Sequence, residues 1–247
     1  MSNPPFKEDE DKDVGNIAGY ERRTFINMGL IVTAAALLPG FVDSAVAAPQ
    51  STKQNVLVIN AHQKYPGISE GKLNNTFTAL IKDEMKNKGY EVRETYIEQG
   101  YNIDEEVQKH LWADIVITQS PMFWFGAPWI YKKYVDEVFT AGMIQQSFIS
   151  GDGRTSDDPS RQYGSGGKLQ GKKFLLSLTM NSPKEAFNDK NQKLHAGRSL
   201  EDLFSATTSV YKFCGFEILP IFGSYDVMRA PQVSRDMEQL KQRLATL

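Results

Sequence analysis

Short apolar runs alternate with helix-like repeats along the chain from about residue 55 onward. The runs are rich in β-branched or aromatic residues and predict strands over 55–60, 90–96, 114–120, 173–179 and 216–223. Between them apolar residues recur every three or four positions, which predicts helices over 73–88, 104–112, 129–139, 200–214 and 233–244. Asp104 is the expected N-cap of the second helix, and Gly89 is the expected C-terminal stop of the first.

Five strands that alternate with helices predict a doubly wound α/β fold, because a parallel sheet must be covered on both faces. The expected architecture is flavodoxin-like, with a five-stranded parallel sheet in the order 2-1-3-4-5 and helices on both faces. Ligands of such sheets bind outside the carboxyl ends of the strands, near the switch in strand order. A site is therefore expected in the loops after Asn60, Ser120 and Thr179.

The first 48 residues carry the pattern of an export signal. Arg22 and Arg23 precede a mostly apolar run, and small residues up to Ala48 follow it. The arginine pair resembles a twin-arginine (Tat) signal, which predicts contact with the Tat translocon, cleavage after Ala47 or Ala48, and a periplasmic product. The run is short for a stable membrane anchor. An uncleaved N-terminal extension is the alternative, and the protein would be cytoplasmic if the signal is not used.

The predicted organisation is a signal peptide over 1–48, a short linker over 49–54 and one domain over 55–247. Residues 1–48 hold four basic and seven acidic side chains, which leaves 24 basic and 23 acidic side chains in the rest. A nearly neutral body argues against nucleic acid as a partner. The single cysteine, Cys214, is interpreted as a packing residue, and the spacing of the three histidines predicts no metal site.

Three loops carry the candidate chemistry. Residues 69–76 combine hydroxyls with a helix start, which suits a phosphate group, although a solvated loop with an ordinary cap explains them equally well. Residues 121–129 hold Phe123, Trp124, Phe125 and Trp129, which could enclose a flat ring; a hydrophobic plug or a dimer contact is the alternative. Residues 179–183 could bind the polar edge of that ring.

Several motifs resemble a known family. They include residues 69–76, 111–114, 126–134, 152–155, 163–173 and 176–181. Together they resemble the bacterial NADPH:quinone reductases of the modulator of drug activity B type, which belong to the flavodoxin-like group that also contains DT-diaphorase. The resemblance extends from about residue 55 to the C-terminus. Two departures are Met122 to Phe125, where the family has Gly-Trp-Trp-Met, and Met180, where it has tryptophan.

The resemblance implies a homodimer that binds FAD, rather than FMN, and reduces quinones by two-electron hydride transfer. It assigns the phosphates and ribityl chain to Ser69, Gly71, Leu73, Asn74 and Thr76. It assigns the isoalloxazine ring to residues after the third and fourth strands, with Tyr163 as a further contact. These ring residues are Pro121, Met122, Phe123, Trp124, Phe125, Thr179, Met180, Asn181 and Ser182.

Quinone reduction also takes up protons, and Tyr163 and His195 are the candidate donors because both lie in irregular segments expected at the ligand end. A solvated loop position is the alternative for His195. NAD(P)H is the electron donor that the resemblance implies, but export would separate the enzyme from it, so a quinol or a redox protein stays open. The competing functions are a flavodoxin-type electron carrier, a binding protein without cofactor, and an azo- or nitroreductase.

Overall fold

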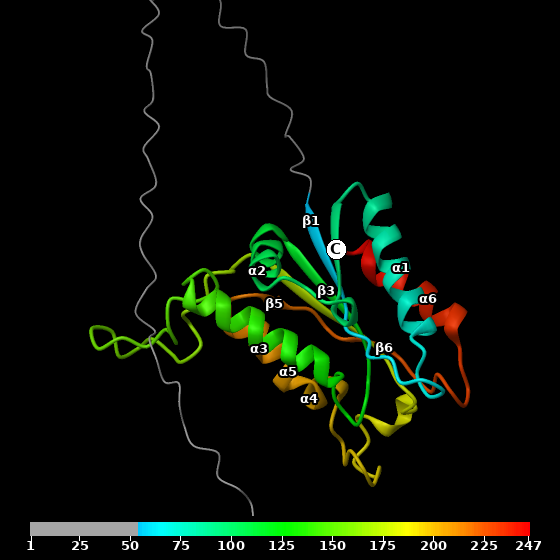
Figure 1. Cartoon of the computed structure of the whole chain (residues 1–247). Helices are drawn as coiled ribbons and strands as arrows, with labels where there is room; N and C mark the ends of the chain where they lie inside the picture. The colour runs from blue at the N-terminus through cyan, green and yellow to red at the C-terminus, as the bar shows by residue number, and fades with distance from the viewer. Residues whose placement is uncertain (1–53) are drawn as a thin grey trace, which may run out of the picture. The chain divides into compact units, whose positions relative to one another are not determined.

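The computed structural model describes residues 54–247, and the predicted signal peptide and most of the linker lie outside them. A parallel sheet runs through the centre (Figure 1), in the order β2-β1-β3-β4-β5 with β6 also paired to β4. The predicted flavodoxin-like order is thus confirmed. The strands are β1 (Asn55–Asn60), β2 (Glu91–Tyr96), β3 (Ile115–Pro121), β4 (Lys173–Thr179), β5 (Glu217–Ile218) and β6 (Phe222–Ser224).

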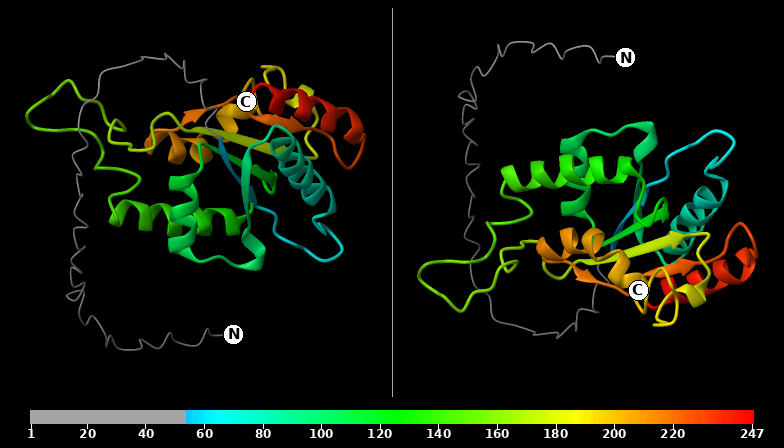
Figure 2. Two further views of the ribbon diagram at one scale, coloured as in Figure 1. Left: turned by 90° about the horizontal axis from the view of Figure 1, so that it is seen from above. Right: turned by 90° about the horizontal axis from the view of Figure 1, so that it is seen from below.

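Helices cover both faces of this sheet (Figure 2), as the alternating pattern predicts. The helices are α1 (Lys72–Asn87), α2 (Ile103–Trp112), α3 (Trp129–Ile144), α4 (Leu200–Leu203), α5 (Ser205–Phe213) and α6 (Val233–Ala245), with short 3₁₀ turns η1 (Ile97–Gln99) and η2 (Lys184–Ala186). Alternate residues of each central strand face opposite sides. Val58 and Ile117 therefore pack in the core under α1 and α6, whereas Leu57 and Val116 pack in the core under α2, α3 and α5.

The edge of the sheet and two helix boundaries differ from the sequence prediction. The predicted fifth strand is split into β5 and β6 around Pro220, which has no N–H to donate to a ladder. The predicted helix over 200–214 is interrupted at Phe204, whose side chain is buried. The N-cap of α2 is Asn102, which accepts a hydrogen bond from the Glu105 N–H, and Asp104 instead lies in the first turn.

The long segment 145–172 lies at the amino end of the strands. It follows the far end of α3 and leads into the start of β4, and it projects beside these elements in Figure 1. Two backbone contacts attach it there: the N–H of Leu169 donates to Cys214 at the end of α5, and the N–H of Glu217 at the start of β5 donates to Lys172. The segment is therefore remote from the loops that follow β1, β3 and β4.

Two findings apply to residues 54–247 alone. Among their helices, none combines the length and apolar character that crossing a membrane requires. The same residues contain no group of three or more His, Cys, Asp or Glu side chains arranged to hold a metal ion.

Candidate functional site

The three loops named from the sequence lie next to one another because their strands pair in parallel register. Asn60 at the end of β1 is paired with Gln119 of β3, and the N–H of Ala61 donates to the Gln119 carbonyl at 2.9 Å. At the end of the next pair, Pro121 is opposite Thr179, and the N–H of Met122 donates to the Thr179 carbonyl at 2.8 Å. The first loop thus adjoins the second, and the second adjoins the third.

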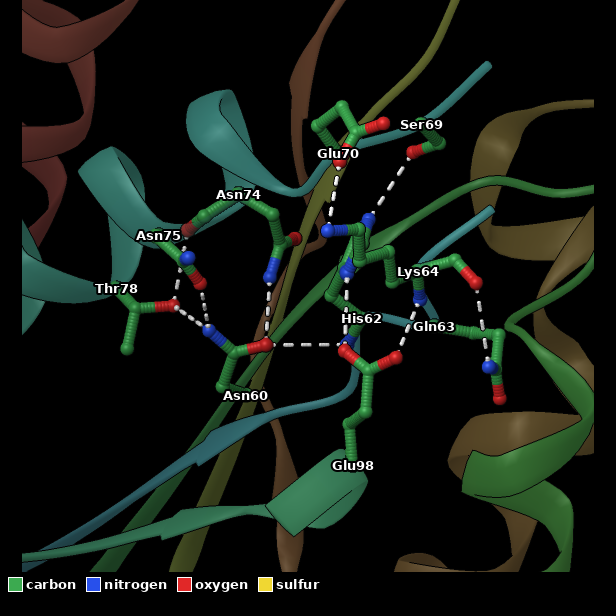
Figure 3. Close-up of polar contacts among 10 residues, drawn as sticks. All are labelled: Asn60, His62, Gln63, Lys64, Ser69, Glu70, Asn74, Asn75, Thr78 and Glu98. Atoms are coloured by element: carbon green, nitrogen blue, oxygen red, sulfur yellow. Dashed lines mark hydrogen bonds and ion pairs between the residues drawn. The ribbon is translucent and has the colours of Figure 1, made fainter. Parts of the chain in front are cut away.

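A buried chain of polar side chains ties these strand ends to α1. Ser177 donates to Gln119 Oε1 at 2.6 Å, and Gln119 Nε2 donates to Asn74 Oδ1 at 3.1 Å. Asn74 Nδ2 in turn donates to Asn60 Oδ1 at 2.9 Å (Figure 3). All four side chains are at most 3% exposed. Because an unsatisfied buried polar group is costly, this complete chain fixes the position of α1 relative to β1, β3 and β4.

The first loop closes on itself and on His62. The N–H of Tyr65 donates to the Ser69 carbonyl and the N–H of Ser69 donates back to Tyr65, at 2.9 and 2.8 Å. His62 Nε2 lies 3.0 Å from Ser69 Oγ, and Nδ1 lies 3.7 Å from Glu98 of η1. Burial lowers the pKa of His62 below its usual 6.5, and the Glu98 charge opposes that shift. The serine hydroxyl is therefore held at the entrance to α1.

The amino end of α1 is open to an anion. Gly71 precedes the helix with φ +81, and a Cβ placed there would lie 2.9 Å from the His62 ring. Within residues 54–247 no side chain caps the helix, and its first turn contains no acidic residue. Free N–H groups and the helix dipole favour negative charge at such an end. With the Ser69 hydroxyl beside it, this corner suits a phosphate or pyrophosphate group.

The second loop presents aromatic side chains on a tight turn. Phe123 and Gly126 exchange backbone hydrogen bonds, and the two residues between them have positive φ, 48° at Trp124 and 68° at Phe125. Positive φ at both central positions is typical of a type I′ turn. The ring of Phe123 lies 5.5 Å from that of Tyr65 in the first loop. Trp124 is 95% exposed, so its side chain is available to a ligand.

The third loop is divided between core and surface. Thr179 and Met180 are buried, and the N–H of Met180 donates to Ser224 at the end of β6. Asn181 is exposed and Ser182 is half-buried, with its carbonyl accepting from Asp226. The Met180 side chain therefore packs within the core, which leaves the exposed side chains of this loop to face a ligand.

Three predicted phosphate-loop residues have structural partners of their own. The Asn74 amide is used within the buried chain, Leu73 packs partly against the core under α1, and the Thr76 hydroxyl donates to Lys72 within the helix. Of the five predicted residues, Ser69 and Gly71 lie directly at the open helix end. Leu73, Asn74 and Thr76 belong to the first turns that support it.

His195 lies beside the aromatic turn. Its ring stacks on Phe187 at 4.6 Å and lies 6.0 Å from the ring of Phe125. The side chain is 4% exposed, and its Nε2 atom is buried without a hydrogen-bond partner among the residues that the structure describes. A buried polar atom that lacks a partner is unusual in a folded protein. The alternative of a solvated loop histidine is wrong.

Tyr163 is at the opposite end of the molecule. It lies in the 145–172 segment, its ring 5.4 Å from that of Phe213 at the end of α5, with the Arg154 guanidinium 5.4 Å above the ring. The expectation that Tyr163 lies beside the three loops is therefore wrong within a single chain, because that segment returns to the start of β4 rather than to the end of β3. The side chain is 69% exposed.

Sequence reasoning missed several residues that organise the site. They share a visible signal, a polar residue inside an apolar strand or just after it, and they are Asn60, His62, Gln119, Ser177 and Ser224. The sequence alone does not reveal the partners of His62, because Ser69 and Glu98 reach it only in the folded chain.

Comparisons with known proteins agree with this architecture. Residues 54–247 match the family model described as flavodoxin-like fold. The chain is 39% identical to the NADPH:quinone oxidoreductase MdaB of Haemophilus influenzae over 181 residues, which cover 73% of this chain and 92% of that protein. The chain therefore belongs to the flavodoxin-like oxidoreductase family that includes the NAD(P)H:quinone reductases.

Solved structures show the same fold. A putative quinone reductase from Klebsiella pneumoniae superposes with a TM-score of 0.65 at 23% identity, over 78% of this chain and 85% of that one. General stress protein 14 of Treponema denticola, solved in complex with FMN, superposes with a TM-score of 0.54 at 17% identity, over 78% of this chain and 98% of that one. At these identities the likeness concerns the fold alone.

Proposed function

We propose that the protein is an FAD-dependent NAD(P)H:quinone oxidoreductase that works by two-electron hydride transfer. The observation that carries the proposal is the meeting of an open, uncapped helix end with an exposed aromatic turn at the carboxyl ends of β1, β3 and β4. One corner suits the phosphates of a dinucleotide and the other suits its ring. The similarity to MdaB supports quinones as acceptors and NADPH as donor.

The residues fit a phosphate-bearing flavin. Ser69 and the backbone around Gly71 would hold the phosphates, supported by the first turns of α1. Pro121 to Phe125 would hold the ring together with Asn181 and Ser182, while the buried Thr179 and Met180 would support that loop from the core. The N–H groups of Trp124 and Phe125 lie outside the Phe123–Gly126 pairing. When bound, the flavin supplies the hydride chemistry, and the protein supplies binding and orientation.

His195 is the side chain best suited to donate a hydrogen bond or a proton to the quinone. Its ring lies 6.0 Å from the ring of Phe125, where a quinone ring would find apolar walls, and its Nε2 has no partner within residues 54–247. In this role Nε2 donates a hydrogen bond or a proton to a quinone oxygen as negative charge develops there. Replacement His195→Gln should lower kcat for quinones about 100-fold. Ferricyanide reduction consumes no proton, so it should keep its rate; equal losses for both acceptors would contradict the proposed role.

A homodimer is part of the proposal. Tyr163 lies at the amino end of the strands of its own chain, so it can contact a flavin only in a second copy. Its exposed ring, backed by Arg154, supports such a contact. Sedimentation of the holoprotein should give the mass of a dimer, and Tyr163→Ala should change the visible spectrum of the bound flavin. A monomer with native activity would refute this part.

Export is proposed on the sequence pattern of residues 1–48. Replacing Arg22 and Arg23 by lysine should retain the protein in the cytoplasm during cell fractionation. An unchanged distribution would contradict the Tat route. Export would also separate the enzyme from NAD(P)H and make a periplasmic donor such as a quinol a candidate. The reduction rate should therefore be measured with NADPH, NADH and a quinol under anaerobic conditions.

The decisive experiment is a visible spectrum of the chain from residue 49 onward, purified and incubated with FAD or FMN. Flavin bands with FAD, and weaker retention of FMN, would support the proposed cofactor. A colourless protein under both conditions would overturn it and favour a cofactor-free binding protein. Flavin binding without quinone turnover would instead favour an electron carrier or an azo- or nitroreductase, which the acceptor panel separates.

A further inference from the structure

The ring of His62 is fixed from several sides. Its backbone N–H donates to Asn60 Oδ1 at 3.0 Å, which sets the turn after β1. The ring lies under the bare Cα of Gly71, and the edge-to-face contact with Phe123 has a centroid distance of 6.2 Å. The side chain is 5% exposed. A ring confined in this way keeps each nitrogen on one partner, as Figure 3 shows around the first loop.

The two ring nitrogens face partners with different hydrogen-bonding capacities. Nδ1 faces the carboxylate of Glu98, which favours a proton on that nitrogen. Nε2 faces Ser69 Oγ, which can either donate to it or accept from it. The charged groups that face the ring are Glu98 from η1 and Glu70 from the loop, and Glu70 is paired with Lys64 at 2.9 Å. Asn60, Gly71 and Phe123 bring no charge.

The hydroxyl of Ser69 has one proton, and two acceptors would compete for it. The Ser69 N–H already donates to Tyr65, so the hydroxyl is the donor that Ser69 can offer to a ligand. A neutral His62 with its proton on Nδ1 accepts that hydroxyl proton at Nε2. A phosphate at the open helix end also needs it, because an ionised phosphate only accepts hydrogen bonds.

We propose that His62 is a positioning residue that takes up one proton when a phosphate-bearing flavin binds, which turns the Ser69 hydroxyl from the His62 ring toward the phosphate. The proton comes from solvent. In the bound state Nε2–H donates to Ser69 Oγ, Ser69 O–H donates to the phosphate, and Nδ1–H faces Glu98. The alternative is a neutral tautomer with its proton on Nε2. This tautomer is disfavoured, because it would direct the Nδ1 lone pair at the Glu98 carboxylate. This inference rests on the proposed flavin site.

Proton uptake makes flavin affinity depend on pH in a stated direction. Binding raises the pKa of His62 from its value in the free protein, where burial holds it below 6.5. The Kd for FAD should therefore rise with pH between the free and bound pKa values, by up to about tenfold per pH unit. Riboflavin lacks a phosphate and should show no such slope. A pH-indicator dye in weak buffer should register proton uptake when FAD is mixed with the protein.

Two variants separate the proposal from a structural role of the ring. In His62→Gln the amide N–H donates to Ser69 at every pH, so FAD should bind with a flat pH dependence. In Ser69→Ala the hydroxyl is lost, and binding should be both weaker and flat. Should His62→Gln fail to fold, NMR titration of the His62 Cε1 proton in the native chain, with and without FAD, gives the same answer.

The outcomes distinguish this inference from the proposed function. FAD that binds with equal affinity from pH 6 to pH 8.5, or with the same slope in His62→Gln, overturns the inference and leaves the flavin site standing. An unshifted His62 titration in the FAD complex does the same. Failure of both FAD and FMN to bind at any pH overturns the proposed function itself.

Discussion

Gly71 joins two requirements in a single residue. Its φ of +81 belongs to the region that glycine occupies without strain, and the His62 ring fills the space where a Cβ would be. Gly89, just beyond the other end of α1, has φ +84, but no described atom lies within 4 Å of the position that its Cβ would take. Substitutions at the two glycines can therefore distinguish the effect of backbone strain from the effect of losing space beside His62.

Both glycines should tolerate alanine poorly, but with different consequences. Each substitution at positive φ should lower the free energy of unfolding by about 1–2 kcal/mol. Gly71→Ala should also displace His62 and weaken FAD binding at least tenfold, whereas Gly89→Ala should leave it unchanged. Urea unfolding and flavin fluorescence quenching measure the two effects. Equal flavin affinity in both variants would contradict the role assigned to the His62 contact.

His110 is a second histidine whose setting the sequence does not reveal. It is fully buried among aromatic rings, and its Nδ1–H donates to the Glu106 carbonyl at 2.9 Å. Its Nε2 has no hydrogen-bond partner in the described part of the chain. Burial lowers its pKa from 6.5 to about 4. The folded protein therefore holds a neutral ring over a range of pH in which the unfolded chain binds a proton.

This histidine should make the protein less stable in acid. As pH falls from 6.5 to 4, the unfolded state gains a proton that the folded state does not, which costs about 3 kcal/mol of unfolding free energy. His110→Phe should lack this contribution. Urea unfolding of both proteins between pH 7 and pH 4 tests it, and parallel stability curves would show the prediction to be wrong. Comparing the two curves removes the shared effect of the carboxylates.

At the scale of elements, the turn between β3 and α3 combines backbone strain with exposed aromatic side chains. Trp124 and Phe125 adopt positive φ although neither is glycine, which is uncommon for bulky residues. Strained positions of this kind occur at functional sites. The turn therefore keeps aromatic side chains where asparagine and glycine would fit the backbone better.

Replacing Trp124 by asparagine and Phe125 by glycine should make the protein more stable but weaken its binding of the ligand. The double variant should raise the free energy of unfolding by about 1 kcal/mol, because the strain at two positions is relieved. It should bind FAD at least tenfold more weakly, since the aromatic wall is lost. Unfolding curves and fluorescence titration provide the measurements. A variant that gains stability and retains full flavin affinity would exclude this turn from the site.

The sequence predicts the elements of this fold well where periodicity is strong. β4 occupies 173–179 as predicted, because its apolar run is short and bounded. The edge beyond it was not predictable in detail, since β5 and β6 are too short to show a period and Pro220 separates them. The three loops were predictable from the order of the strands. The buried chain between Asn60 and Ser177 was not, because its bonds join segments far apart in the sequence.

At the scale of the whole molecule, two cores share one sheet. Residues on one face of the strands pack under α1 and α6, and residues on the other face pack under α2, α3 and α5. Cys214, at the end of α5, is 4% exposed, and burial raises the pKa of its thiol to about 12. Because Cys214 is the single cysteine of the chain, labelling with a thiol reagent reports on the exposure of this one position.

Cys214 should react with thiol reagents only through unfolding. In native protein at pH 8 the thiolate is scarce and covered, so labelling should be far slower than in the unfolded chain. Its dependence on urea should share a midpoint with the circular dichroism of the helices, as expected for one cooperative unit. Complete labelling before the helices are lost would show that the α5 side opens independently.

The buried chain from Asn60 to Ser177 has a consequence for how the protein matures. Its members come from three strands and a helix that meet only when the sheet has closed. In a partly folded chain, the amino end of α1 and the aromatic turn would not yet be positioned relative to each other. Cofactor capture would then be a late event, and a yellow protein would be one that has finished folding. The flavin absorbance of a preparation would thus report the protein that has completed folding.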